Sequence, residues 1–238
     1  MKNNPAPNIV ILGALFGTTL VASRFSVGQM APLTYVSIRL SMAGLAFIII
    51  YAFSIGGRKW PSDPTLWRRG IILGVLGTAL PMIAFTSSLQ YLSSGLTSVL
   101  MTTSPAFTVV MAHFLLPDEK LTISKGIGVL LALLGGLLLT LSGESGLNNE
   151  ASVSLIGYVL VFIGIISANS MGIFVRIKMK TYKTYDVAVI RMIAASLAIF
   201  PFSFFISGYD ISQVNTSGWL VLLYAAMAGT FFAMLLDF

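Results

Sequence analysis

Eight long runs of apolar residues, separated by short polar segments, occupy most of this 238-residue sequence. Most runs are near the roughly 20 residues that a helix needs to cross the hydrocarbon core of a bilayer. The runs are continuous rather than alternating, which favours helices over the strands of a membrane barrel. Charged residues make up only 9% of the chain, whereas a soluble domain carries about 25%. We therefore predict an all-α polytopic membrane protein. Its eight spans are expected near residues 9–27, 33–55, 70–92, 96–116, 126–141, 155–175, 187–207 and 218–238.

The sequence also contains an internal repeat with an offset of 152 residues. This offset aligns rare landmarks with one another, namely Arg24 with Arg176, Arg39 with Arg191, Trp67 with Trp219, and Gly77-Thr78 with Gly229-Thr230. Equivalent positions are five spans apart, and a duplicated unit with an odd number of spans must enter the bilayer in opposite directions. We predict two inverted five-helix repeats, residues 1–152 and 153–238. The second is expected to be truncated after three helices.

The distribution of cations predicts the orientation of the chain. Every second loop is basic, and the loops between them contain no Lys or Arg. The basic residues are Arg58, Lys59, Arg68 and Arg69 in the first such loop, Lys120 and Lys125 in the second, and Arg176, Lys178, Lys180 and Lys183 in the third. By the positive-inside rule these loops and the N-terminus are cytoplasmic. We expect a multi-pass protein of the cell (inner) membrane, whose first span is retained rather than cleaved as a signal peptide.

The net charge of +6 has a competing explanation, which is nucleic-acid binding. The cations are spread over short loops rather than gathered on one domain, so the charge is better explained by topology, and no nucleic-acid partner is expected. The expected partners are the lipid bilayer and a small-molecule substrate, and a homodimer is possible.

Two arginines, Arg39 and Arg191, lie well within predicted spans, whereas Arg24 and Arg176 are nearer helix ends and are interpreted as anchors. In one interpretation Arg39 and Arg191 face a central cavity, where they attract anionic groups of a substrate or pair with a gating carbonyl. In the other they reach the headgroups and fix the depth of their helices. Because the two helices run in opposite directions, we expect Arg39 near the outer mouth and Arg191 near the inner mouth.

Polar residues within the first, third, fourth and sixth spans supply the other candidates for substrate contact. With the two arginines, the predicted substrate-binding residues are Thr19, Ser23, Gln90, Thr103, Asn169 and Ser170. Hydroxyl groups can bond their own helix or allow close helix packing, so packing is the alternative for many of them. Asn169 and Gln90 carry amides that their own helix satisfies poorly, which indicates a cavity or an interhelical bond.

Several functional classes are disfavoured by what the sequence lacks. It contains no H-E-x-x-H, no G-x-S-x-G and no Walker A pattern, and no pair of carboxylates within a span. It has no cysteine and one histidine, His113, for which a proton relay and an inert interfacial position are the two interpretations. No catalytic residues, metal ligands or cofactors are predicted, and the protein is not expected to be an enzyme.

The whole chain resembles the drug/metabolite transporter superfamily of the EamA repeat type. The resemblance is carried by Pro32-x6-Arg39 and by the fourth-to-fifth-span segment, followed by a glycine pattern. These motifs are Ser104-Pro105-Ala106-Phe107, Pro117-Asp118-Glu119-Lys120-Leu121-Thr122, Gly126-Ile127-Gly128 and Leu133-Leu134-Gly135-Gly136. In the second copy, the stretch from Tyr185-Asp186 to Arg191 lacks the proline of the first.

The resemblance implies ten helices in two inverted repeats and a carrier, commonly an exporter of amino acids, other metabolites or drugs. We therefore expect a secondary transporter that works by alternating access without ATP, with its site near the middle of the membrane. The alternatives are a membrane-embedded enzyme, a lipid-processing protein and a structural membrane protein.

Overall fold

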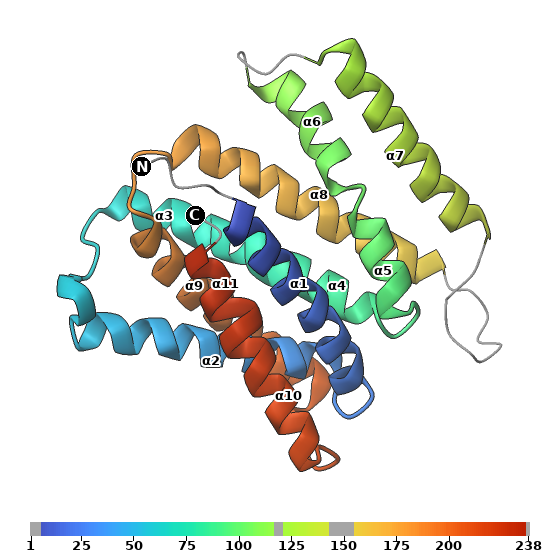
Figure 1. The fold of residues 1–238 in the computed structure, drawn as a ribbon. Helices are drawn as coiled ribbons and strands as arrows, with labels where there is room; N and C mark the ends of the chain where they lie inside the picture. Colours follow the sequence, from blue (N-terminus) through green and yellow to red (C-terminus); the bar gives the residue numbers. More distant parts are fainter. Residues whose placement is uncertain (1–5, 117–120, 143–154, 237–238) are drawn as a thin grey trace. The chain divides into compact units, whose positions relative to one another are not determined.

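The structure, a computed structural model, describes residues 6–116, 121–142 and 155–236. The described residues form helices, turns and connecting segments, and no strand is found among them (Figure 1). The predicted all-α fold is therefore confirmed. The chain packs as two compact units, one of residues Met1–Val75 and Thr181–Phe238 and the other of Leu76–Lys180. We call them unit 1 and unit 2.

Unit 1 combines the first helices of the chain with the last. Its elements are α1 (Ala6–Val27), α2 (Pro32–Ala52), η1 (Ile55–Gly57), α3 (Pro64–Gly74), α9 (Thr184–Ser207), α10 (Thr216–Ala226), η3 (Met227–Phe232) and α11 (Ala233–Leu236). Helix α9 packs along both α2 and α3, and α1 lies beside α10. A hydrogen bond of 2.7 Å between the Thr18 and Tyr224 hydroxyls joins α1 to α10.

Close approach of α9 to its neighbours depends on small residues. At Gly74 of α3, an added Cβ would lie 2.5 Å from the carbonyl oxygen of Arg191. A side chain there would push α3 away from α9, because little in a packed interior can yield to it. The core of unit 1 contains large buried side chains such as Tyr35 and Phe47 of α2 and Met192 of α9.

Polar and proline residues set the starts of these helices. Pro32 occupies the first position of α2, where its missing N–H costs nothing. The Asp63 carboxylate accepts a 2.8 Å bond from the Thr65 N–H and caps α3. The Asn215 side chain does the same for α10 through the Gly218 N–H. At the other end, Gly208 adopts a positive φ of 64° and ends α9.

Unit 2 contains the middle helices of the chain. Its elements are α4 (Leu80–Ser88), α5 (Ser94–Met101), α6 (Ser104–Leu115), α7 (Ile123–Ser142) and α8 (Leu155–Lys178), preceded by η2 (Val75–Ala79), which begins at the last residue of unit 1. Helix α8 packs against α4 and α6, and α7 lies beside α6 (Figure 1). Leu92, Leu100, Tyr158, Val161 and Ile165 form the buried cluster of this unit.

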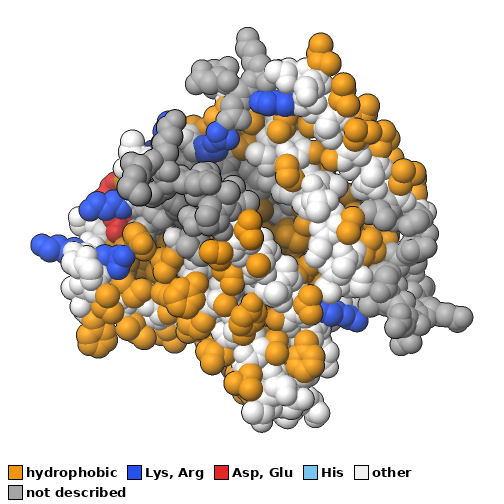
Figure 2. Space-filling model, in the orientation of Figure 1, with side chains coloured by type: hydrophobic (Ala, Val, Ile, Leu, Met, Phe, Trp, Pro, Cys, Tyr) orange, Lys and Arg blue, Asp and Glu red, His pale blue; other side chains and the backbone are white. Residues whose placement is uncertain are grey.

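Seven helical segments of the described chain are long and apolar enough to cross a membrane. They correspond to all the predicted spans but the fifth, and the fifth forms α7, whose apolar part Ile123–Leu138 is shorter. Many apolar side chains on these helices face outward, including Leu45, Leu130 and Phe205, which is 82% exposed. On the face drawn in Figure 2, hydrophobic side chains predominate over Lys and Arg. Outward apolar surface of this extent is expected of a protein whose solvent is lipid.

The predicted span boundaries require two corrections. The third span runs over Pro64–Ser88 rather than 70–92, because Pro64 and the Asp63 cap start the helix earlier. The fourth is divided into α5 and α6 at Thr102 and Thr103, just before Pro105. A proline at this position removes a backbone donor and clashes with the preceding turn, which breaks the helix.

The internal repeat recurs in the bounds of the helices. With the 152-residue offset, α3 (Pro64–Gly74) aligns with α10 (Thr216–Ala226) at both ends. In both cases the helix continues into a π-helix, η2 from Val75 and η3 from Met227, which again differ by the same offset. The aligned Gly77-Thr78 and Gly229-Thr230 lie inside these two π-helices. The division into repeats near residue 152 stays a prediction, since residues 143–154 are outside the described part, as are Asp118 and Glu119.

Candidate functional site

The guanidinium of Arg39 lies in a buried polar cluster within unit 1. Only 6% of Arg39 is exposed. Its Nε donates to Thr230 Oγ1 at 2.8 Å, its Nη1 to Ser23 Oγ at 3.3 Å, and its Nη2 to the Gly229 carbonyl at 3.3 Å. The Ser23 hydroxyl is also 3.1 Å from the hydroxyl of Tyr35. Helices α1, α2 and η3 therefore meet around one cation, and Arg39 points into the helix bundle rather than toward headgroups.

The charge of Arg39 has no counter-ion among the described residues. The three described carboxylates are held by other groups: Asp63 by Thr65 and Tyr182, Asp186 by Tyr51, and Asp210 by Ser212. Insertion scales put the cost of an arginine in mid-membrane at about 2.5–3.5 kcal/mol. A cluster of neutral hydroxyl and carbonyl oxygens lowers this cost, but it does not neutralise the charge.

The π-helix η3 supplies two of the Arg39 acceptors. A π-helical turn replaces i→i−4 bonding with i→i−5 bonding and leaves a backbone carbonyl incompletely bonded. Here the Thr230 hydroxyl donates to the Ala225 carbonyl at 3.1 Å and accepts from Arg39. Thr230 thus connects the interrupted segment of α10 to the cation on α2.

Thr19 of α1 completes the cluster, and its hydroxyl is unusual. Thr19 is 4% exposed, and its Oγ1 has no hydrogen-bond partner among the described residues. The side chain packs directly on Gly229, where an added Cβ would collide with the Thr19 hydroxyl. Only glycine therefore fits at position 229 while α1 and η3 lie this close.

The predicted pair of arginines occupies different surroundings. Arg191 lies on α9, partly buried, and its backbone carbonyl faces Gly74 of α3. Arg39 is the more deeply buried of the two. Their roles as attractors at opposite mouths stay a prediction.

Asn169 and Ser170, both on α8 in unit 2, are partly buried. The Asn169 Oδ1 accepts a 2.8 Å bond from the Thr108 hydroxyl, and its Nδ2 donates to Ser104 Oγ at 2.9 Å. The amide thus forms the interhelical bond that was one of its two expected environments, and it holds α8 to the start of α6. The Ser170 hydroxyl bonds its own helix through the Ile166 carbonyl at 2.6 Å.

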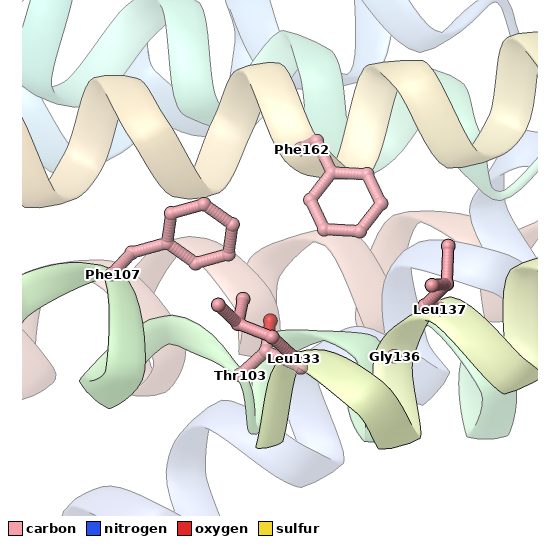
Figure 3. A pocket seen from close by; sticks show the side chains of 6 residues that line it. All are labelled: Thr103, Phe107, Leu133, Gly136, Leu137 and Phe162. Carbon is pink, nitrogen blue, oxygen red and sulfur yellow. The ribbon is translucent and has the colours of Figure 1, made fainter. Parts of the chain in front are cut away.

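Thr103 lines a cavity of ≈ 330 Å³ in unit 2. Figure 3 shows Thr103 and Phe107 on one side, Leu133, Gly136 and Leu137 of α7 on another, and Phe162 of α8 opposite. The Thr103 hydroxyl donates to the Leu100 carbonyl at 2.7 Å, so its hydrogen is used within its own turn. The cavity is apolar. Its wall can pack against the hydrocarbon part of a ligand, but it does not recognise polar groups.

Gln90 does not have the buried position that its place in a predicted span indicated. It lies in the turn that follows α4, and its side chain is exposed. The α4 helix ends at Ser88, so water or headgroups can satisfy the amide. His113 is also exposed, and its Nδ1 accepts a 3.1 Å bond from the Leu121 N–H.

Residues that sequence reasoning missed are mainly hydrogen-bond partners. Tyr35, Thr230, Gly229, Ser104 and Thr108 hold Arg39, Ser23 or Asn169 in place. The repeat provided one usable signal, because Gly229-Thr230 aligns with Gly77-Thr78. The repeat offset alone does not predict that Arg39 contacts Gly229-Thr230.

Tyrosines and basic residues gather at the loops of unit 1 that join α2 to α3 and precede α9. The Tyr182 hydroxyl donates to Asp63 Oδ2 at 2.9 Å. Bonds from the Thr65 N–H and from Tyr182 keep the pKa of the Asp63 carboxyl below its ordinary value, and the bond to Asp63 raises the pKa of Tyr182. The guanidinium of Arg58 lies 4.0 Å from the centre of the Tyr185 ring, a cation–π distance.

These features define a class of protein: a multi-pass helical membrane protein whose spans carry buried polar clusters and paired helix interruptions. A profile of the EamA-like transporter family matches residues 6–141 and 155–238. The chain belongs to the EamA-like transporter family. It is thus a membrane transporter, as the resemblance in its sequence implied.

Individual relatives agree with this assignment. The chain is 23% identical over 224 residues to an uncharacterized transporter of Archaeoglobus fulgidus, covering 92% of this chain and 74% of that protein. It is 25% identical over 231 residues to the uncharacterized transporter YoaV of Bacillus subtilis, covering 97% of this chain and 77% of the relative. A solved crystal structure superposes with a TM-score of 0.65 at 17% identity, over 97% of this chain and 77% of the other, and shows the similarity of fold.

Proposed function

We propose that the protein is a secondary carrier that moves a small metabolite, amino acid or drug-like compound out of the cell by alternating access, without ATP. The observation that carries this proposal is the pair of π-helices at equivalent positions of the repeat, η2 at Val75–Ala79 and η3 at Met227–Phe232. Interrupted helices at corresponding places in two halves of a transporter are the best structural pointer to its binding site.

Physical chemistry explains why such interruptions matter. Backbone groups freed from regular helical bonding are costly in lipid unless protein, water or ligand satisfies them. In η3 the Thr230 hydroxyl donates to the Ala225 carbonyl and the distant Arg39 donates to the Gly229 carbonyl. Contacts of this kind can be exchanged, because each acceptor is a neutral group that a polar ligand can replace.

The remaining parts of the proposal concern orientation and chemistry. The carrier lies in the cell (inner) membrane with a cytoplasmic N-terminus, as its basic loops indicate. Its proposed substrate contacts are Thr19, Ser23, Arg39 and Arg191 in unit 1, and Thr103, Asn169 and Ser170 in unit 2, with Gln90 in the turn after α4. It performs no covalent chemistry on what it moves.

Flux measurement in proteoliposomes tests the proposal. The purified protein is reconstituted without ATP, and a panel of labelled amino acids, other metabolites and drug-like cations is screened for movement across the bilayer. Saturable flux of at least one compound above protein-free liposomes is expected. Hydrolytic turnover of a panel compound without any flux would instead favour the membrane-enzyme alternative.

A matched pair of variants connects the flux to the interrupted helices. Thr78→Val and Thr230→Val alter the two aligned π-helices while keeping the volume of the side chain, and both are expected to reduce flux. Thr97→Val is the control, because this buried threonine on α5 lies outside both interruptions and its hydroxyl has no described partner. Unchanged flux in both π-helix variants would show that the interrupted helices are not required for transport.

A further inference from the structure

We propose that Arg39 binds one carboxylate group of the transported molecule, which takes the place of neutral acceptors that the guanidinium contacts in this structure. The inference rests on the proposed carrier function and adds the class of substrate to it: compounds with a free carboxylate. It starts from the buried charge of Arg39, which has no counter-ion in the described part of the chain.

The Arg39 guanidinium has no anionic partner among the described residues. A buried cation is stable when an anion lies beside it, and removal of the partner of such a pair is costly. Every described carboxylate is engaged elsewhere, and Arg39 donates to the hydroxyls of Thr230 and Ser23 and to the Gly229 carbonyl, with the Tyr35 hydroxyl beside Ser23. A substrate that brings its own negative charge supplies the anion that the described residues do not place beside Arg39, and a neutral analogue does not.

The three nitrogens of the Arg39 guanidinium are held unequally. Its Nε is held by the short 2.8 Å bond to Thr230, whereas Nη1 and Nη2 make contacts of 3.3 Å to Ser23 and to the Gly229 carbonyl. The Nη1 and Nη2 bonds are the weaker ones, since charge-assisted bonds are normally about 2.7–2.9 Å long. These two nitrogens form the end-on edge of the group, which a carboxylate can bind with both oxygens at once.

The hydroxyl of Thr19 has no hydrogen-bond partner among the described residues. It is buried beside Gly229, which is also the residue whose carbonyl faces Nη2. A buried hydroxyl without a partner is destabilising, and native structures rarely keep one without a reason. A carboxylate that displaces the Gly229 carbonyl from Nη2 would offer Thr19 the acceptor that it lacks.

These contacts also indicate what must move. Thr19 packs tightly on Gly229, so α1 and η3 leave no space between them in this structure. The carboxylate can enter only if α1 and η3 separate while Nε keeps its bond to Thr230. Arg39 then has one set of neutral partners in the closed arrangement and an anionic partner in the open one.

Matched probe pairs test the inference in proteoliposomes made with the full chain. The pairs are L-leucine and L-leucinamide, L-phenylalanine and L-phenylalaninamide, and hexanoate and hexanamide. Each pair differs in its carboxylate, and the hexanoate pair carries no amine. Loss of a charged partner lowers apparent affinity by about tenfold or more. We expect the wild-type protein to move at least one carboxylate about tenfold better than its amide at low concentration.

Three variants assign any discrimination to this site. Arg39→Gln should abolish the preference for the carboxylate, and Arg39→Lys should restore it in part because a lysine keeps the charge without the two-point contact. Thr19→Val should weaken carboxylate flux without lowering the unfolding temperature, since its hydroxyl has no described partner to lose. Thr97→Val, with the same kind of buried hydroxyl on α5, should change neither property.

The outcomes separate this inference from the carrier proposal. Equal flux of carboxylates and amides, or discrimination that survives Arg39→Gln, overturns the inference and leaves a carrier. If Arg39→Gln does not fold, the inference is tested by the carboxylate preference of the wild-type protein and of Thr19→Val. A carboxylate preference in Thr19→Val equal to that of the wild type overturns the inference. No flux of any compound, in this set or in the wider panel, contradicts the carrier itself, and the inference falls with it.

Discussion

Arg39 and Thr230 lie 191 residues apart in the sequence and are joined by a 2.8 Å hydrogen bond from Nε to Oγ1. Arg39 belongs to the second helix of the first predicted repeat, and Thr230 to the interrupted third helix of the second. The contact therefore connects the two halves of the duplication inside unit 1. It also places the most deeply buried cation of the described spans on one of the two π-helices.

Thr230→Val should destabilise the protein more than Thr97→Val does. The first change removes an acceptor from Arg39 and a donor from the Ala225 carbonyl, whereas the second removes a hydroxyl with no described partner. Loss of a hydrogen bond to a charged group costs about 1.5–3 kcal/mol. Thermal unfolding in detergent measures the difference. Equal unfolding temperatures for the two variants would mean that the Arg39–Thr230 bond contributes little to stability.

Asn169→Leu should abolish transport while the protein remains folded and inserted. The amide binds Ser104 and Thr108 across α8 and α6, and Thr108 can fall back on the Ser104 carbonyl at 3.1 Å, which limits the loss of stability. Thr102→Val is a suitable control, because that hydroxyl bonds its own turn through Val99. Flux with unaltered apparent affinity in Asn169→Leu would make Asn169 a packing residue.

The sequence predicted the helices well because lipid leaves few alternatives. A backbone in a bilayer must satisfy its own hydrogen bonds, so an apolar run of about 20 residues becomes a helix. The same logic failed at Gln90, since the apolar run continues to Leu92 while α4 ends at Ser88. Hydropathy measures composition, and it does not detect the turn between Ser88 and Leu92.

The candidate site was predicted less completely, for reasons that particular residues show. Arg39, Ser23 and Thr19 stand out as polar residues in apolar runs, and they do lie together. Their partner Gly229-Thr230 is separated from them by most of the chain, and no local pattern links the two. The π-helices were equally hidden, because Gly77-Thr78 and Gly229-Thr230 mark the two segments in the sequence but do not by themselves indicate a change in helix type.

Replacement of Asp63 should make stability less dependent on pH. Bonds from the Thr65 N–H and the Tyr182 hydroxyl hold the pKa of Asp63 below its ordinary value of 3.8. A lowered folded-state pKa contributes stability that is present above 3.8 and is lost as the pH falls through the folded-state pKa. Asp63→Asn should therefore unfold at a lower temperature than wild type at pH 7, and the difference should shrink toward pH 3. A difference that stays constant over this range would show that the carboxylate charge is not involved.

Single cysteines can test the predicted orientation, because the chain contains none of its own. The sequence predicts Ser62→Cys in a basic loop and Gly146→Cys in a loop without Lys or Arg. An impermeant thiol reagent applied to intact cells should label Gly146→Cys and spare Ser62→Cys until the membrane is permeabilised. The reverse pattern of labelling would place the N-terminus outside the cell.

Solute counterflow in proteoliposomes tests the central claim most directly. Vesicles are loaded with an excess of an unlabelled compound that the flux panel identifies, and a trace of the labelled compound is added outside. A carrier that alternates between two faces exchanges one molecule for another, so the label should accumulate transiently above its equilibrium level in loaded vesicles and not in empty ones. Label that enters loaded and empty vesicles at the same rate, without overshoot or saturation, would contradict alternating access.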